Sequence, residues 1–197
     1  MSRSPIAARL LAAVLGLVNS LPALAEGGTI SGKVDATPAK YLEETIVYLK
    51  SVPGTYKPHK VSMDQRGMKF IPHILVATQG DSVKFLNNDN VAHNVYSPDG
   101  EGYNLGTFKQ NEDASYTYGK VGVYAQLCSI HPEMLAYVFV GQNPYAAVVG
   151  AGGKYAIKDV PPGTYQLAVW NPKLKAPEKS VTVTAGKSVE ENLSIKR

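Results

Sequence analysis

Short apolar stretches separated by turn residues restrict the fold of this chain more than any other feature. After residue 26, apolar and polar residues alternate over short runs that end at breakers such as Gly80-Asp81 and Pro161-Pro162. This period of two is typical of half-buried β-strands, and the 12 Tyr residues add to the preference for strands. Only residues 39–50 could form a helix, and their β-branched and aromatic second half favours a strand. The sequence therefore predicts an all-β protein.

The first 25 residues have the pattern of a secretory signal peptide. Arg3 and Arg9 are positively charged, residues 10–18 are apolar, and Ala23-Leu24-Ala25 is a cleavage pattern. The apolar run is shorter than the roughly 20 residues that span a bilayer, so we predict no membrane span. A retained amphipathic anchor is the alternative to cleavage. We expect the mature chain to be exported, most simply to a bacterial periplasm.

The net charge does not favour binding to nucleic acid or to anionic lipid. The chain has a formal net charge of +4, which falls to +2 without residues 1–25 because Arg3 and Arg9 are lost. Proteins that bind nucleic acid usually carry a much stronger basic patch. We therefore expect neither class of partner.

The chain contains a single cysteine, Cys128. One cysteine cannot form a disulfide within the chain, and it excludes zinc or iron–sulfur sites that need several cysteines. A free thiol is also a liability in an oxidising compartment. Cys128 therefore needs a function, although a lone buried cysteine is usually a small apolar core residue.

Three other candidate metal ligands accompany Cys128. The segment Cys128-Ser-Ile-His131-Pro-Glu-Met134 joins two predicted strands, and His93 lies where another predicted strand ends. A thiolate and two imidazoles in a plane, with a weak axial thioether, form a blue-copper centre that suits one-electron transfer. Taken alone, His93 would be a structural histidine and Met134 a core residue. Together, His93, Cys128, His131 and Met134 predict a site for one copper ion that alternates between Cu(I) and Cu(II).

The surrounding motifs extend this pattern. They are Met68-Lys69-Phe70 with Pro72, Gly80-Asp81 with Asn87, His93-Asn94-Val95, Gly122-x-Tyr124 and Cys128-x-x-His131-x-x-Met134. On these residues the chain resembles a cupredoxin of the plastocyanin/amicyanin group, of the kind labelled methylamine-utilisation proteins. The resemblance implies a Greek-key β-sandwich, the four copper ligands above, and an Asn94 that holds the thiolate loop. It also implies that an apolar patch beside His131, made by Ile130, Pro132 and Leu135, docks a redox partner.

Nearby residues leave alternatives open. Glu133 could bind copper in place of Met134 and give a centre with more oxygen coordination. Met68 and His73 could form an accessory site, although the resemblance implies that Met68 packs in the core. We expect His73 to lie at the surface and His59 to lie in a solvated linker.

The remaining segments carry a second pattern. Residues 153–167 contain Gly-x-Tyr-x-Ile followed by Pro-Pro-Gly-x-Tyr-x-Leu, which resembles the second half of a carboxypeptidase-regulatory-like β-sandwich. Residues 30–34 and 45–49 look like its first strands. We predict a signal peptide (1–25), a copper domain (55–143) and a β-sandwich (27–54 plus 144–197). The copper domain is inserted into this sandwich or, alternatively, followed by it.

These observations predict an electron carrier and not an enzyme, because we find no Ser/His/Asp set, paired carboxylates or open three-His site. The expected partners are redox proteins such as a c-type cytochrome or a periplasmic dehydrogenase. A periplasmic copper storage or delivery protein with the same ligands is the alternative, although Met-rich ligands are more usual there. A third possibility is a carbohydrate-binding or structural envelope protein that uses Tyr165 and Trp170.

Overall fold

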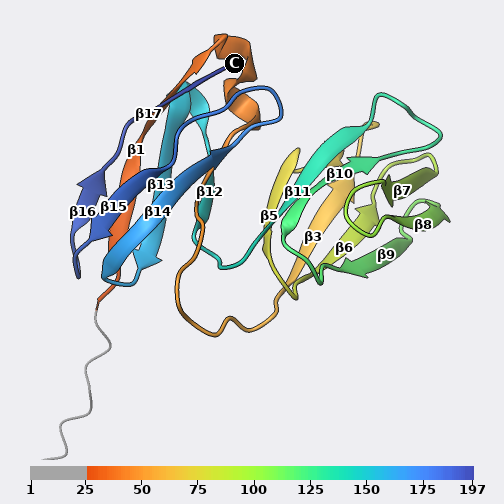
Figure 1. The fold of residues 1–197 in the computed structure, drawn as a ribbon. Coiled ribbons are helices and arrows are strands. Elements are labelled where there is room, and N and C mark those ends of the chain that lie inside the picture. Colours follow the sequence, from red (N-terminus) through yellow and green to blue (C-terminus); the bar gives the residue numbers. More distant parts are fainter. Residues whose placement is uncertain (1–25) are drawn as a thin grey trace, which may run out of the picture.

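The structure, a computed structural model, describes residues 26–197 and is built almost entirely of β-strands (Figure 1). Within these residues it contains 17 strands and two short 3-10 helices, which confirms the all-β prediction. No helix in this range is both long and apolar enough to cross a membrane. The predicted signal peptide, residues 1–25, lies outside the described residues, so export stays a prediction.

The two ends of the described chain form one sandwich of two sheets. Its sheets have the strand orders β13-β1-β16, with β17 also paired to β1, and β12-β2-β14-β15. The elements are β1 (Gly28–Thr37), η1 (Ala39–Glu44), β2 (Ile46–Leu49), β12 (Ala146–Val148), η2 (Ala151–Gly153), β13 (Lys154–Val160), β14 (Gly163–Trp170), β15 (Lys179–Val183), β16 (Ser188–Glu190) and β17 (Leu193–Lys196). Residues before position 50 thus pair with residues after position 145. We call this unit the flanking sandwich.

The middle of the chain forms a second sandwich, which we call the middle sandwich. Its sheets have the orders β4-β3-β6-β9 and β5-β11-β10-β7-β8. The strands are β3 (Lys60–Gln65), β4 (Phe70–Ile71), β5 (Ile74–Thr78), β6 (Ser82–Asn87), β7 (His93–Ser97), β8 (Tyr103–Phe108), β9 (Asp113–Thr117), β10 (Gly122–Leu127) and β11 (Leu135–Gly141). From these pairings we interpret the middle sandwich as an insertion between β2 and β12.

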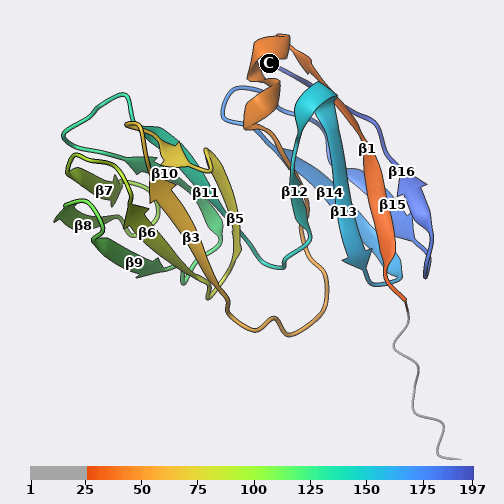
Figure 2. The same cartoon turned by 180° about the vertical axis from the view of Figure 1, so that it is seen from behind.

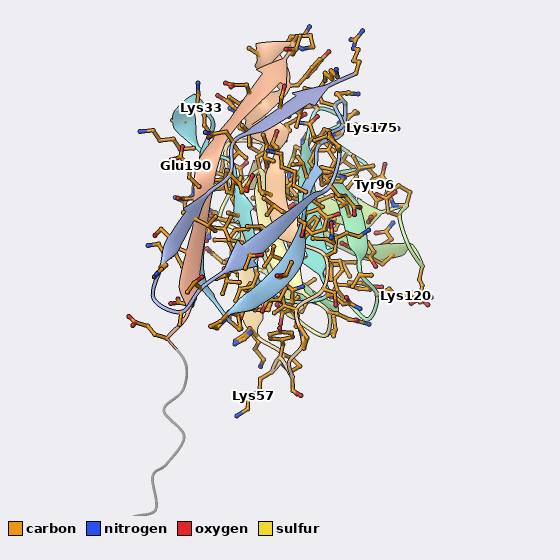
Figure 3. The ribbon with its side chains drawn as sticks, turned by 60° about the vertical axis from the view of Figure 1, so that its left-hand side comes forward. Lys33, Lys57, Tyr96, Lys120, Lys175 and Glu190 are labelled. Atoms are coloured by element: carbon orange, nitrogen blue, oxygen red, sulfur yellow. The ribbon has the colours of Figure 1, made fainter. Side chains whose placement is uncertain are left out.

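Alternating burial along the strands explains why this sequence folds into sheets. In β17, Leu193 and Ile195 are buried while Ser194 and Lys196 are exposed, so one face of the strand enters the core. Each sandwich has its own buried apolar cluster, one around Ile30 and the other around Phe85. The charged side chains of Lys33, Lys175 and Glu190 lie on the exposed surface of the flanking sandwich (Figure 3).

A third apolar cluster joins the two sandwiches, which lie side by side (Figure 2). It contains the buried side chains of Ile46, Ile74 and Phe139. The ring of Phe139 lies 4.8 Å from that of Tyr48, and the ring of Tyr137 lies 5.0 Å from that of Trp170. Because β11 and β5 belong to the middle sandwich and β2 and β14 to the flanking one, these rings form the contact between the units.

Replacing Phe139 with alanine is expected to destabilise the protein by about 3–5 kcal/mol, because a buried ring is lost and a cavity remains. The effect should reach the flanking sandwich, since Phe139 packs on Tyr48. Urea unfolding followed by the fluorescence of Trp170 measures it. The control Val148→Ala, at an exposed position of β12, should change stability by less than about 0.5 kcal/mol. If the urea midpoint reported by Trp170 fluorescence were the same in Phe139→Ala as in the wild type, coupling of the two sandwiches across this contact would be contradicted.

Candidate metal centre

His93, Cys128 and His131 lie together at one end of the middle sandwich. Their ligand atoms are all within 4.8 Å of one another, the one group of this kind found within residues 26–197. Cys128 directly follows β10, His131 lies on the loop to β11, and His93 belongs to β7, which pairs with β10. This loop projects from the upper end of the middle sandwich in Figure 1. Residues separated by more than 30 positions in the sequence therefore meet because their strands are neighbours in one sheet.

The position of His93 differs from the prediction in one respect. It is the first residue of β7 and not the end of a strand. The preceding turn is fixed by Asn87, whose side-chain amide donates to the Val91 carbonyl at 2.9 Å and whose side-chain oxygen accepts from the Asp89 N–H at 2.9 Å. The strand expected before His93 is thus β6, which ends at Asn87, and the turn delivers His93 to the site.

The three candidate ligands direct their donor atoms toward one point. The Nδ1 atoms of His93 and His131 lie 3.0 Å apart, and Cys128 Sγ lies 3.8 Å from His131 Nδ1. Two nitrogens that bind one ion at about 2.0 Å each are themselves separated by roughly 3 Å. The spacing of the two imidazoles therefore fits a shared metal ion.

Asp89 sets the orientation of His93. The Nε2 of His93 lies 3.0 Å from Asp89 Oδ2, so the ring donates its Nε2–H to the carboxylate and keeps the Nδ1 lone pair for the site. The Met68 N–H also donates to Asp89, at 2.8 Å. These two donors, the Met68 N–H first, lower the pKa of Asp89 below its ordinary value, which keeps it a carboxylate. The sequence reasoning missed Asp89; the signal that could have revealed it is a carboxylate four residues before a candidate ligand.

Asn94 connects the strand of His93 to the loop between β10 and β11 (residues 128–134), which we call the cysteine loop. Its backbone N–H points to Cys128 Sγ at 3.4 Å, and its side-chain oxygen accepts from the Ser129 N–H at 3.3 Å. Its side-chain amide donates to Asn104 Oδ1 and to the Gly106 carbonyl, both at 2.8 Å. Asn94 thus holds the cysteine loop against β7 and β8, which is the role that the resemblance implied for it.

Met134 and Glu133 lie in contrasting environments. Met134 is 1% exposed and belongs to the same apolar cluster as Cys128, and its backbone N–H donates to the His131 carbonyl at 3.0 Å. Glu133 is exposed and is not part of the group of converging donors. Met134 is therefore buried in the same core cluster as the thiol, whereas Glu133 faces solvent, which favours Met134 over Glu133 as a fourth ligand.

Met68 and His73, the residues of the possible accessory site, both lie at the surface. The expectation that Met68 packs in the core is wrong: its side chain is 40% exposed. The reason is the tight turn between β3 and β4, where Gly67 and Met68 have φ values of 60° and 57° and the chain reverses at the surface. His73 is exposed, as expected, and its Nε2 lies 3.1 Å from Glu44 Oε1 of the flanking sandwich.

Comparisons with known proteins cover parts of this chain. A family model described as polysaccharide lyase family 4, domain II, matches residues 140–191, which is less than half of the chain. No curated protein matches the chain. The resemblance of the flanking segments to a carboxypeptidase-regulatory-like sandwich stays a prediction.

Several solved cupredoxin structures are similar to part of the chain. A purple cupredoxin from Nitrosopumilus maritimus is 23% identical, with 41% of this chain and 99% of that chain covered and a TM-score of 0.38. A reduced amicyanin variant is 27% identical, with 41% and 80% covered and a TM-score of 0.39. A copper-containing nitrite reductase from Thermus scotoductus is 24% identical, with 49% and 25% covered and a TM-score of 0.41. All three TM-scores are below 0.5.

Replacing Asp89 with alanine is expected to weaken Cu(II) binding by about 10- to 100-fold, because His93 loses the acceptor that orients it. Competition with a chelator of known affinity measures this change. Asp113→Ala is the matched control, because Asp113 forms a surface ion pair with Lys84 at 3.0 Å on β9. Equal affinities of the two variants would contradict an orienting role for Asp89.

Proposed function

We propose that this chain is an exported type 1 copper protein that transfers single electrons between redox partners without transforming a substrate. The observation that carries the proposal is the convergence of Cys128 Sγ with the two facing Nδ1 atoms of His93 and His131. The partners that we propose are redox proteins of the periplasm, such as a c-type cytochrome or a dehydrogenase.

The donor types select copper over other common metals. Structural zinc sites are built from thiolates, imidazoles and carboxylates, whereas thioether sulfur favours Cu(I). Here the buried apolar cluster that contains Cys128 also contains the thioether side chain of Met134. Two facing Nδ1 atoms at 3.0 Å also repel each other unless a proton or a cation lies between them. A bound copper ion would satisfy both nitrogens and would supply the one-electron change between Cu(I) and Cu(II).

The residues around the donors hold them in place during such a change. Asp89 fixes the ring of His93. Asn94 fixes the cysteine loop, because its backbone N–H points to Cys128 Sγ and its side-chain oxygen accepts from the Ser129 N–H. A donor set that keeps its geometry in both oxidation states needs little rearrangement when an electron moves. The surrounding β-sheet supports this rigidity, because β10 pairs with both β7 and β11.

Burial restricts access to one side of the centre. His93 and Cys128 are 0% and 2% exposed, whereas His131 is only partly buried. Ile130, which precedes His131, and Leu135, at the start of β11, have apolar side chains that are 49% and 37% exposed. Electrons would therefore pass at the edge of His131, across a small apolar contact of the kind found in weak electron-transfer complexes.

Copper storage or delivery with the same ligands is the alternative. A protein that releases its metal quickly needs donors that solvent or a partner can reach. The burial of His93 and Cys128 makes such exchange slow, so it favours the carrier.

Loading the protein with Cu(II) should give an intense blue absorption from the thiolate, and Cys128→Ser should abolish it. Glu133→Gln serves as the control and should keep the colour, because Glu133 lies outside the donor group. Visible absorption spectroscopy measures both variants. A colourless wild-type protein whose copper exchanges rapidly would instead support delivery.

Ile130→Glu should slow electron exchange with a reduced c-type cytochrome by about tenfold, because a carboxylate disrupts an apolar contact worth more than about 1 kcal/mol. Stopped-flow absorption of the cytochrome measures the rate. Val148→Glu makes the same change at an exposed position of the flanking sandwich and should have no effect. Unchanged rates in Ile130→Glu would show that partners dock elsewhere.

A further inference from the structure

The surface beside Met134 contains a hollow whose polar residues have no part in the proposed electron transfer. Its volume is about 480 Å³, and its walls come from the β3–β4 turn (Met68 to Phe70), from His73, and from Glu133 to Leu135. Met134 forms part of the wall although its side chain is only 1% exposed. Met134, the proposed fourth ligand of the centre, is therefore also part of the wall of the hollow.

Met68 places a thioether at this hollow in an unusual way. It adopts a φ of 57°, in the left-handed region that residues other than glycine rarely occupy, and its side chain is 40% exposed. Its N–H donates to Asp89 Oδ2, the same oxygen that accepts from His93 Nε2. The backbone of Met68 is therefore fixed relative to the centre, while its side chain is open to solvent.

His73 supplies an imidazole whose orientation is also fixed. Its Nε2 lies 3.1 Å from Glu44 Oε1, and its ring packs edge-on against Tyr137 with 5.8 Å between ring centres. When Nε2 carries the hydrogen that Glu44 accepts, Nδ1 keeps a lone pair that can bind a metal. A carboxylate behind a histidine is the arrangement that commonly supports metal-binding histidines.

We propose that Met68, His73 and Glu133 form an uptake site for Cu(I), through which copper reaches the centre past Met134. The proposal rests on the copper centre proposed above. Thioether and imidazole favour Cu(I), and the exposed carboxylate of Glu133 adds a negative charge that attracts a cation. Lys69 also lines the hollow. Its positive charge weakens the binding of Cu(I), which suits a site that holds the ion only transiently.

Transfer from the hollow to the centre needs no change in oxidation state. Copper stays Cu(I) throughout and exchanges the donors Met68 and His73 for Met134, Cys128 and the two histidines of the centre. The Cys128 thiol loses its proton to water as the copper–sulfur bond forms. The donors of the hollow return to their free state.

The uptake site is tested by adding Cu(I) to the copper-free protein under anaerobic conditions. A weak chelator keeps the Cu(I) in solution before it is mixed with the protein. Stopped-flow ultraviolet absorption of the thiolate–Cu(I) bond follows the filling of the centre. The double variant Met68→Leu/His73→Gln should fill about tenfold more slowly, because two donors of the hollow are lost. Its final copper content and the blue colour after oxidation should equal those of the wild type. His59→Gln removes an exposed histidine outside the hollow and should fill at the wild-type rate.

The possible outcomes separate this proposal from the proposed function. A double variant that fills within about twofold of the wild-type rate would overturn the uptake site and leave the copper centre intact. Wild-type protein that never shows the thiolate–copper absorption would overturn both. As a second measurement, Cu(I) added to Cys128→Ser should shift the NMR signals of the Met68 methyl group and the His73 ring. Unshifted signals would overturn the uptake site.

Discussion

The hydrogen bonds of Asn94 tie together the two segments on which the whole candidate centre depends. Its N–H points to Cys128 Sγ, and its side chain links Ser129 on the cysteine loop to Asn104 and Gly106 of β8. Besides these bonds, the contact of the His131 ring with the His93 ring attaches the loop between β10 and β11 to β7. With them, the thiol is held at a defined position relative to His93, the residue next to Asn94. The geometry of the donors is therefore a property of the sheet and not of the loop alone.

A second set of contacts extends this control beyond the donor atoms. The buried carboxylate of Asp89 accepts from the ring of His93 and from the backbone of Met68. It thereby joins the turn before β7 to the turn between β3 and β4, which lie in different sheets of the middle sandwich. One carboxylate thus orients a proposed copper ligand and fixes the wall of the neighbouring hollow. Function and uptake, as we propose them, share this structural support.

The flanking sandwich meets the middle sandwich mainly through the aromatic side chains of β11. Its β2 and β14 pack through Tyr48 and Trp170 against Phe139 and Tyr137 of β11. The same strand, β11, begins directly after Met134. Met134, the proposed fourth ligand, therefore directly precedes the strand that forms the junction, while the pair His73–Glu44 connects the hollow to η1. His131 stays partly exposed, so it could serve the redox partner that we propose.

Local patterns in the sequence were enough to predict the all-β class, which the structure confirms, and to propose the candidate donor residues, because a strand period of two and a Cys-x-x-His-x-x-Met spacing are both local. The sequence could not place Asp89 or Met68 correctly. The importance of Asp89 arises from contacts with Met68 and His93, and the exposure of Met68 arises from a left-handed turn that its apolar character does not indicate. Only the tertiary structure decided which donors meet, because the convergence of His93 with Cys128 results from the pairing of β7 with β10, and such long-range pairing is set by the packing of the whole sheet.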